Sequence, residues 1–197
     1  MPRNPLTSAL YISAKSEEHE LYPFAPQVIQ VLYSFDVPEQ LMAHLLLVHD
    51  VAFRLTERIC NIWPKLQFDR KRVLFGAATH DIGKCIYTNE LAEEGHKHEK
   101  AGKSLLLKIG ICEDFAKFAA THASWSAASS IEELLVSIAD KIWKGSREQE
   151  LEDLLVEKIA KETGCERYEV FANLDSIIQD ITDDTDWRLA WQNKELH

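Results

Sequence analysis

Apolar residues recur along most of this chain with the three-to-four-residue spacing of amphipathic helices, whereas the two-residue alternation of strands is nearly absent. Cap and turn residues divide the pattern into helices predicted over 26–35, 36–64, 68–84, 98–110, 112–124, 130–145, 147–164 and 166–184. Asp69 is predicted to cap the third helix, Gly83 to end it, and Ser130 with Glu133 to form a capping box. Residues 1–26 are predicted to be irregular, and the tail 185–197 is undecided. The pattern therefore predicts an all-α fold, a compact helical bundle.

Length, composition and charge narrow the class of protein. The 197 residues suit one domain with extensions, and we expect an N-terminal part at 1–35, a core at 36–147 and C-terminal helices packed on it at 148–197. The net charge of −10 argues against binding to double-stranded nucleic acid. The longest apolar runs are too short to span a membrane, and no secretory signal is evident at the start. Four scattered cysteines without a C-x-x-C pair indicate reduced thiols, so we expect a cytoplasmic protein.

Several polar residues interrupt the apolar faces of these helices. His80 and Asp81 follow the apolar run "RVLFGAA", where a buried carboxylate is costly unless it is paired or binds a cation. His98 heads an apolar stripe, His122 shares an apolar face, and Asp140 lies in a helix that is apolar almost all round. A single histidine on such a face is more often a hydrogen-bonded core residue. Several of them, together with two aspartates, indicate a divalent-metal site to which each helix contributes one or two ligands.

The order of these residues resembles the HD-domain superfamily of metal-dependent phosphohydrolases. The segments that carry the resemblance are "AHLLLVHDVA", "THDIGK", "HKHEKAG", "ATHASW" and "IADKIWKG", and together they cover about residues 40–147. The family fold is a compact bundle of about five helices, which agrees with the helices predicted above.

The resemblance implies a divalent-metal centre, with two ions expected among Fe, Mn, Co, Ni, Zn and Mg. It assigns the first ion to the first-motif histidine, His80, Asp81 and Asp140, and the second ion to Asp81, His98 and His122. His98 is preferred to His96 because "HEKAG" matches the family pattern H-E-x-x-G.

Two residues compete for the position of the first histidine. His44 and His49 lie on one predicted helix and point about 140° apart, so helix geometry barely separates them. The family pattern places an apolar residue at +4, a small one at +8 and an apolar one at +11. From His44 these positions hold Val48, Ala52 and Leu55, so the pattern favours His44 as the ligand.

The resemblance also implies hydrolysis of a phosphate ester or anhydride by a metal-activated water, with Asp81 and Lys84 as the catalytic residues. We expect Lys84, Lys141, Lys144 and Arg147 to bind the phosphate, although the last three suit a surface turn equally well. The substrate is expected to be a nucleotide, a dinucleotide or another small phosphate ester. The 18 residues from His122 to Asp140 resemble the spacing in hydrolases of diadenosine tetraphosphate, and the absence of G-Y-P disfavours the cyclic di-GMP class.

Two alternatives stay open at this point, and both keep the same ligands. One is a mixed-valence di-iron oxygenase, and the other is a non-catalytic, metal-stabilised signalling or binding module. An oligomer is possible in each case. The segment "AGKS" at 101–104 lacks the earlier glycine of a phosphate-binding loop and is not interpreted as one.

Overall fold

The computed structural model describes residues 20–195, and within them the all-α prediction is confirmed, since no β-strand is formed. The α-helices are α1 (Pro26–Tyr33), α2 (Glu39–Ile62), α3 (Arg70–Thr79), α4 (Lys97–Lys108), α5 (Glu113–Ala116), α6 (Phe118–Thr121), α7 (Ile131–Ile142), α8 (Gln149–Thr163), α9 (Arg167–Thr182) and α10 (Thr185–Glu195). Two 3₁₀ helices, η2 (Ile82–Cys85) and η3 (Thr88–Leu91), connect α3 to α4. None of the described helices is both long and apolar enough to cross a membrane.

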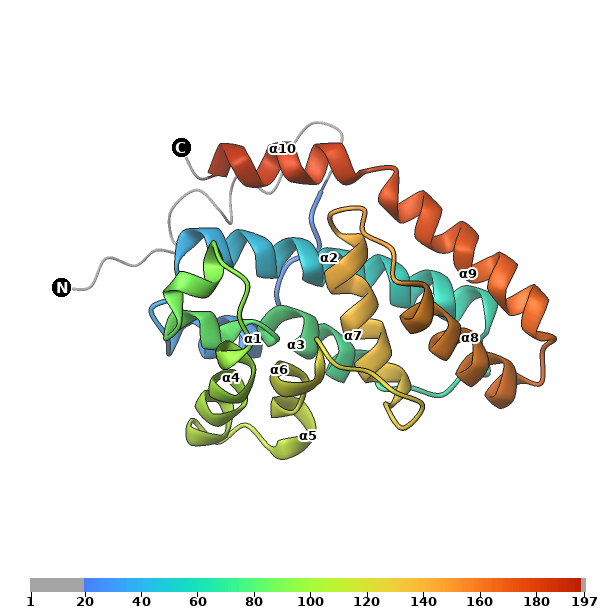
Figure 1. The fold of residues 1–197 in the computed structure, drawn as a ribbon, viewed down its shortest axis with the longest axis horizontal. Coiled ribbons are helices and arrows are strands. Elements are labelled where there is room, and N and C mark those ends of the chain that lie inside the picture. The colour runs from blue at the N-terminus through green and yellow to red at the C-terminus, as the bar shows by residue number, and fades with distance from the viewer. Residues whose placement is uncertain (1–19, 196–197) are drawn as a thin grey trace.

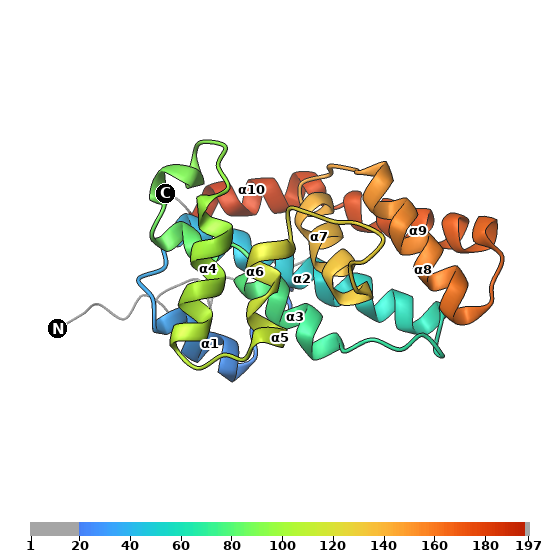
Figure 2. The same cartoon turned by 60° about the horizontal axis from the view of Figure 1, so that its bottom comes forward.

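The long helix α2 lies at the centre of the molecule. Helices α3, α7, α9 and α10 pack against it, and α8 packs against α7 and α9. The C-terminal helices α9 and α10 run along α2 on the side away from α1 (Figures 1 and 2). The apolar stripe predicted for α2 is buried throughout, with no more than 1% of any member exposed: Leu41, Leu45, Val48, Ala52, Leu55 and Ile59. Each large side chain of this stripe contributes about 1.5–3 kcal/mol of burial free energy, so α2 is the main support of the core.

The predicted helix starts are confirmed where the sequence contains capping residues. The Asp69 carboxylate accepts hydrogen bonds from the backbone N–H groups of Lys71 and Arg72. Ser130 and Glu133 form a reciprocal capping box at the start of α7. Both caps satisfy N–H groups that have no partner inside the helix, which fixes where α3 and α7 begin.

The prediction that Gly83 ends a helix over 68–84 is wrong. Helix α3 ends at Thr79, and the chain continues through His80 and Asp81 into η2. Gly83 is not in the left-handed conformation of a helix-ending glycine. A Cβ atom on Gly83 would lie 1.9 Å from the carbonyl oxygen of His98 and 2.7 Å from the nitrogen of Gly102. The glycine therefore allows η2 to pack directly on the backbone of α4.

Two further differences concern the predicted helices near the site and the end of the chain. The helix predicted over 112–124 is divided at Lys117 into the short helices α5 and α6. Within the undecided tail, Thr185–Glu195 form α10, whose Arg188 is only 1% exposed. The Arg188 guanidinium donates hydrogen bonds to the carbonyl oxygens of Trp143, at 2.8 Å, and Ile181. Arg188 therefore fastens α10 to the C-terminal end of α7.

Candidate metal centre

All six side chains that the sequence analysis expected to bind metal meet at one place. They come from five parts of the fold: His44 from α2, His80 and Asp81 from the end of α3, His98 from α4, His122 from the end of α6, and Asp140 from α7. These elements are held together by the packing of α2 on α3 and α7, and of α4 on η2 and α6.

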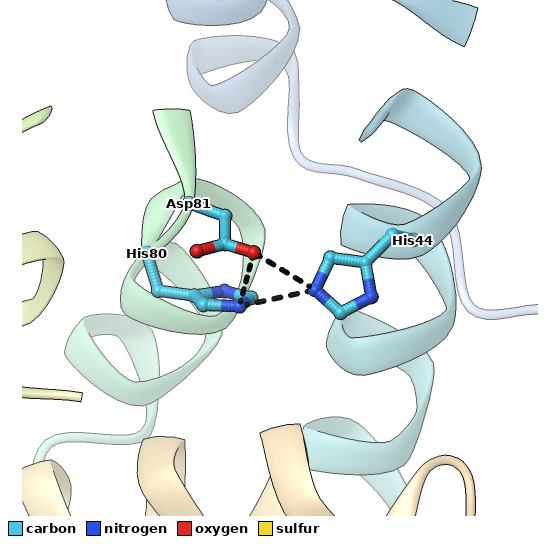
Figure 3. A group of neighbouring side chains, drawn as sticks. All are labelled: His44, His80 and Asp81. Atoms are coloured by element: carbon cyan, nitrogen blue, oxygen red, sulfur yellow. Dashed lines mark hydrogen bonds and ion pairs between the residues drawn. The ribbon is translucent and has the colours of Figure 1, made fainter. Parts of the chain in front are cut away.

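The first cluster consists of His44, His80, Asp81 and Asp140. The Nε2 atoms of His44 and His80 are 3.2 Å apart, and the Oδ2 atom of Asp81 lies 3.3 Å from His44 Nε2 and 3.6 Å from His80 Nε2 (Figure 3). The Oδ1 atom of Asp140 lies 3.2 Å from His80 Nε2 and 3.5 Å from His44 Nε2. Two imidazoles and two carboxylates thus converge on one small volume.

The second cluster shares Asp81 with the first. The Oδ1 atom of Asp81 lies 3.1 Å from His98 Nε2 and 3.5 Å from His122 Nε2. The two oxygen atoms of Asp81 therefore face different pairs of histidines, an arrangement suited to a carboxylate that bridges two cations.

Hydrogen bonds on the far side of three rings orient their Nε2 atoms toward the centre. The Nδ1 atom of His80 lies 2.9 Å from the Ala77 carbonyl oxygen, and that of His122 lies 3.2 Å from the Ala119 carbonyl oxygen. His98 places Nδ1 2.6 Å from Oε2 of Glu90. Donation from Nδ1–H to an oxygen acceptor leaves Nε2 with a free lone pair, which is the form in which histidine binds a metal.

The two carboxylates of the centre and the histidines around them shift one another's pKa values. Burial opposes the charged forms of Asp81 and Asp140, but the neighbouring histidines, His80 first, hold the pKa of both carboxyls well below the usual value. Burial also lowers the pKa of His44, yet hydrogen bonds to Asp140 and Asp81 outweigh it and raise that pKa to about 9. Burial, with the adjacent His80, lowers the pKa of His122 to about 4. The metal-free centre thus holds two carboxylates, a protonated imidazole at His44 and a neutral imidazole at His122 at physiological pH.

The residues present fit divalent metal ions. Asp81 Oδ1 and His98 Nε2 are both buried, and neither has a hydrogen-bond partner within the described part of the chain. Buried polar atoms are normally satisfied, so two facing atoms without partners point to a missing ligand. Imidazole nitrogens together with carboxylate oxygens are the donors that divalent transition metals prefer.

A cavity of about 330 Å³ opens onto both clusters. Lys84 and Lys144 line it, and the Lys84 ammonium lies 2.7 Å from Asp81 Oδ2. Helix α10 contributes Gln192 to the wall. The sequence pattern predicts no helix in this part of the chain and so gives no sign of this residue.

Two of the four expected phosphate-binding residues are not brought to this cavity. The Lys141 ammonium lies over the Trp125 ring, 5.7 Å from its centroid. The Arg147 guanidinium binds both carboxylate oxygens of Glu152, at 2.6 and 2.7 Å, and Asp175 at 2.8 Å. Arg147 thus joins the end of α7 to α8 and α9 through its Nε and Nη2 atoms.

His49 and His96, the alternatives to His44 and His98 as ligands, both lie outside the centre. His49 is 1% exposed, its ring stacks on Tyr22, and its Nδ1 atom lies 3.3 Å from the Tyr22 carbonyl oxygen. The side chain of His96 is 84% exposed and pairs with Glu99. His49 therefore anchors the segment before α1 to α2, and His96 lies on the surface.

Glu90 is a residue of the centre that the sequence did not reveal. Its side chain is 4% exposed and contacts His98 from behind. Glu90 lies in the acidic segment "NELAEEGH", and its sequence surroundings do not distinguish it from the neighbouring glutamates. Only the folded loop distinguishes it from them.

Comparison with known families agrees with this geometry. A family model of the HD domain matches residues 41–143, which contain all six clustered side chains. The chain therefore belongs to the HD-domain family. This family is part of a superfamily that consists in general of metal-dependent phosphohydrolases. No curated protein and no solved structure matches the chain significantly.

Proposed function

We propose that this protein is a metal-dependent phosphohydrolase that acts on a small phosphorylated substrate of the nucleotide class. The observation that carries the proposal is the position of Asp81. Its two oxygens face two histidine pairs, and the cavity above them is lined by lysines. The match to the HD-domain family supports the same chemistry.

The side chains of the centre have distinct tasks in this proposal. Asp81 and Asp140 supply the negative charge that retains divalent cations, and His44, His80, His98 and His122 supply neutral nitrogen donors. Divalent ions held there would supply an activated water and polarise the phosphoryl oxygens. Binding a cation at the first cluster requires His44 to give up its proton below its pKa of about 9.

Lys84 and Lys144 are suited to hold the phosphate group. Both line the cavity, and Lys84 reaches the Oδ2 atom of Asp81, so its ammonium lies beside the place where charge develops on the phosphoryl oxygens. Ammonium groups are strong point charges for phosphate in an otherwise acidic protein.

The other lining residues support a substrate that has a polar organic part. Gln40 and Gln192 bring carboxamides to the cavity wall, and Leu41, Leu91 and Trp143 bring apolar surface. Carboxamides donate and accept hydrogen bonds in pairs, as the edge of a nucleobase does. A nucleotide uses both parts of this cavity, whereas inorganic phosphate uses only the lysines.

The test is a hydrolysis assay of the metal-loaded protein. Protein is stripped with a chelator, reloaded separately with manganese, iron, cobalt and magnesium, and incubated with nucleotides, dinucleotides and simple phosphate esters. We expect release of phosphate or a nucleotide with at least one metal, and no release from the Asp81→Asn variant. Turnover of an organic substrate that depends on oxygen, without hydrolysis, contradicts the proposal and favours the oxygenase alternative. Metal binding without any turnover favours the non-catalytic module.

A further inference from the structure

We infer that Glu90 is a positioning residue for the cluster of Asp81, His98 and His122, and that its carboxylate sets the metal affinity of this cluster. The inference rests on the metal centre of the proposed function, but not on the identity of the substrate. Glu90 belongs to η3, while His98 lies in the first turn of α4, so the contact joins two separate elements.

Glu90 holds His98 at two points, the backbone and the ring. The Oε2 atom of Glu90 lies 3.1 Å from the backbone nitrogen of His98 and 2.6 Å from its Nδ1 atom. The Oε1 atom accepts a hydrogen bond from the backbone N–H of Lys97 at 3.2 Å. One carboxylate therefore fixes both where α4 begins and how the His98 ring is rotated.

The ring contact directs His98 toward Asp81. With its Nδ1–H donated to Glu90, His98 presents Nε2 to Asp81 Oδ1, which lies 3.1 Å away. A carboxylate behind a ligating imidazole fixes its tautomer and increases the basicity of the donor nitrogen. The side chains of Glu90 and His98 are only 4% and 7% exposed, so water competes little for either bond.

The loop before α4 is shaped to admit this carboxylate. A Cβ atom on Gly95 would lie 2.5 Å from the Cδ and Oε1 atoms of Glu90. Only glycine at this position leaves room for the Glu90 side chain as it stands. The close approach explains why the acidic segment contains one glycine immediately before His96.

A second carboxylate–histidine pair, His96 with Glu99, flanks His98 in the sequence and offers a matched control. The Glu99 Oε1 atom lies 2.7 Å from the Nδ1 atom of His96, nearly the same separation as in the Glu90–His98 pair. The His96 side chain is 84% exposed and takes no part in either cluster. The Glu99→Gln substitution therefore makes the same chemical change without touching the centre.

The experiment compares Glu90→Gln with Glu99→Gln by titration with cobalt(II), followed by elemental analysis of the dialysed proteins. Glutamine keeps a carbonyl oxygen that can cap α4 but removes the negative charge behind His98. We expect Glu90→Gln to weaken cobalt binding at the cluster of Asp81, His98 and His122 about 10- to 100-fold, and Glu99→Gln to bind cobalt as the wild type does. Both substitutions are repeated in a His122→Ala background, where this cluster is already broken. There Glu90→Gln is expected to cause no further loss.

Two results would overturn the inference while leaving the metal centre intact. One is wild-type cobalt affinity in Glu90→Gln. The other is that Glu90→Gln lowers the cobalt affinity by the same factor in the presence and in the absence of His122. A wild-type protein that binds no cobalt or any other divalent ion overturns the inference together with the metal centre.

A measurement on the wild type keeps the inference testable if Glu90→Gln does not fold. In the zinc-loaded protein, NMR compares the Nδ1–H protons of His98 and His122, whose acceptors are 2.6 and 3.2 Å away. We expect the His98 proton to resonate further downfield, because its acceptor is a carboxylate at short range. A His98 proton no further downfield than that of His122 contradicts the assignment of Glu90.

Discussion

Asp81 Oδ1 and His98 Nε2 face each other at 3.1 Å in the interior, yet neither atom has a hydrogen-bond partner among residues 20–195. A buried polar group without a partner costs about 1–3 kcal/mol. An imidazole nitrogen and a carboxylate oxygen opposite each other are both satisfied only when a cation lies between them. A proton on His98 does this in the metal-free protein, where burial opposes the charged ring but Asp81 favours it, so that the pKa of His98 is raised. A divalent cation that takes the place of this proton satisfies both atoms and also reaches the neighbouring ligands.

Substitution of Asp81 tests the shared ligand. Asp81→Asn keeps the size of the side chain but removes the charge that serves both clusters, so we expect loss of metal from both and loss of hydrolysis. The wild type should gain about 3–4 kcal/mol of stability at metal concentrations of 100 to 1,000 times the dissociation constant. The variant should gain almost none. Metal content by elemental analysis and unfolding temperature with and without metal are the measurements. An Asp81→Asn protein with full metal content contradicts the assignment.

His44 and His49 should respond in opposite ways to substitution by alanine. His44→Ala is expected to lose metal from the first cluster while the metal-free protein stays folded, since the side chain borders the cavity. His49→Ala is expected to keep its metal but to lose about 2 kcal/mol of stability, because a buried ring packed on Tyr22 and Phe24 is removed. Metal titration and chemical denaturation separate the two effects. Metal loss in the His49 variant alone would reverse the choice of ligand.

The buried ring of His49 should make the metal-free protein sensitive to acid. Burial lowers the pKa of His49 from 6.5 to about 4, so the unfolded chain binds a proton between these pH values when the folded protein does not. Stability therefore falls as the pH falls from about 6.5 to about 4, by up to about 3 kcal/mol for this residue. His49→Gln should remove that share of the pH dependence, whereas the exposed His96→Gln should not. Denaturation curves at pH 7, 6, 5 and 4 with a chelator present measure it, and equal profiles for both variants contradict the prediction.

The contact between η2 and α4 predicts a large effect for Gly83→Ala. The added methyl would meet the backbone of His98 and Gly102, which cannot move aside, so we expect a loss of about 3 kcal/mol or more and weaker metal binding. Gly164→Ala is the control, because it changes only a glycine with φ of +74° that has open space around it. It should cost about 1 kcal/mol and leave metal binding unchanged. Denaturation midpoints of the two variants provide the comparison, and equal losses contradict the role given to Gly83.

Much of the fold could be predicted because its signals are local. In the apolar stripe of α2, each residue is three or four positions from the next, and the Asp69 cap and the capping box of α7 each involve residues within one turn. The position of the site could be predicted because His80 and Asp81 are buried after an apolar run and Asp140 interrupts an apolar helix, which is costly without a ligand.

The remaining features depend on contacts between distant segments. Arg188 is buried against the carbonyl oxygen of Trp143, 45 residues away, and nothing local distinguishes it from an exposed arginine. Glu90 is selected from several glutamates only by the way its loop folds onto α4. Gly83 has the sequence position of a helix-ending glycine, yet its role comes from α4, which packs against it. Arg147 lies just after α7, the helix that carries Asp140, but its guanidinium binds Glu152 and Asp175. The spacing of residues in the sequence does not indicate these partners.

Anomalous diffraction from crystals of the wild-type protein loaded with manganese tests most directly whether Asp81 bridges two metal ions. We expect anomalous peaks on both sides of the Asp81 carboxylate, one next to His44, His80 and Asp140 and the other next to His98 and His122. Peaks confined to other parts of the molecule, or no peak in contact with Asp81 in a protein shown by elemental analysis to contain manganese, would contradict it.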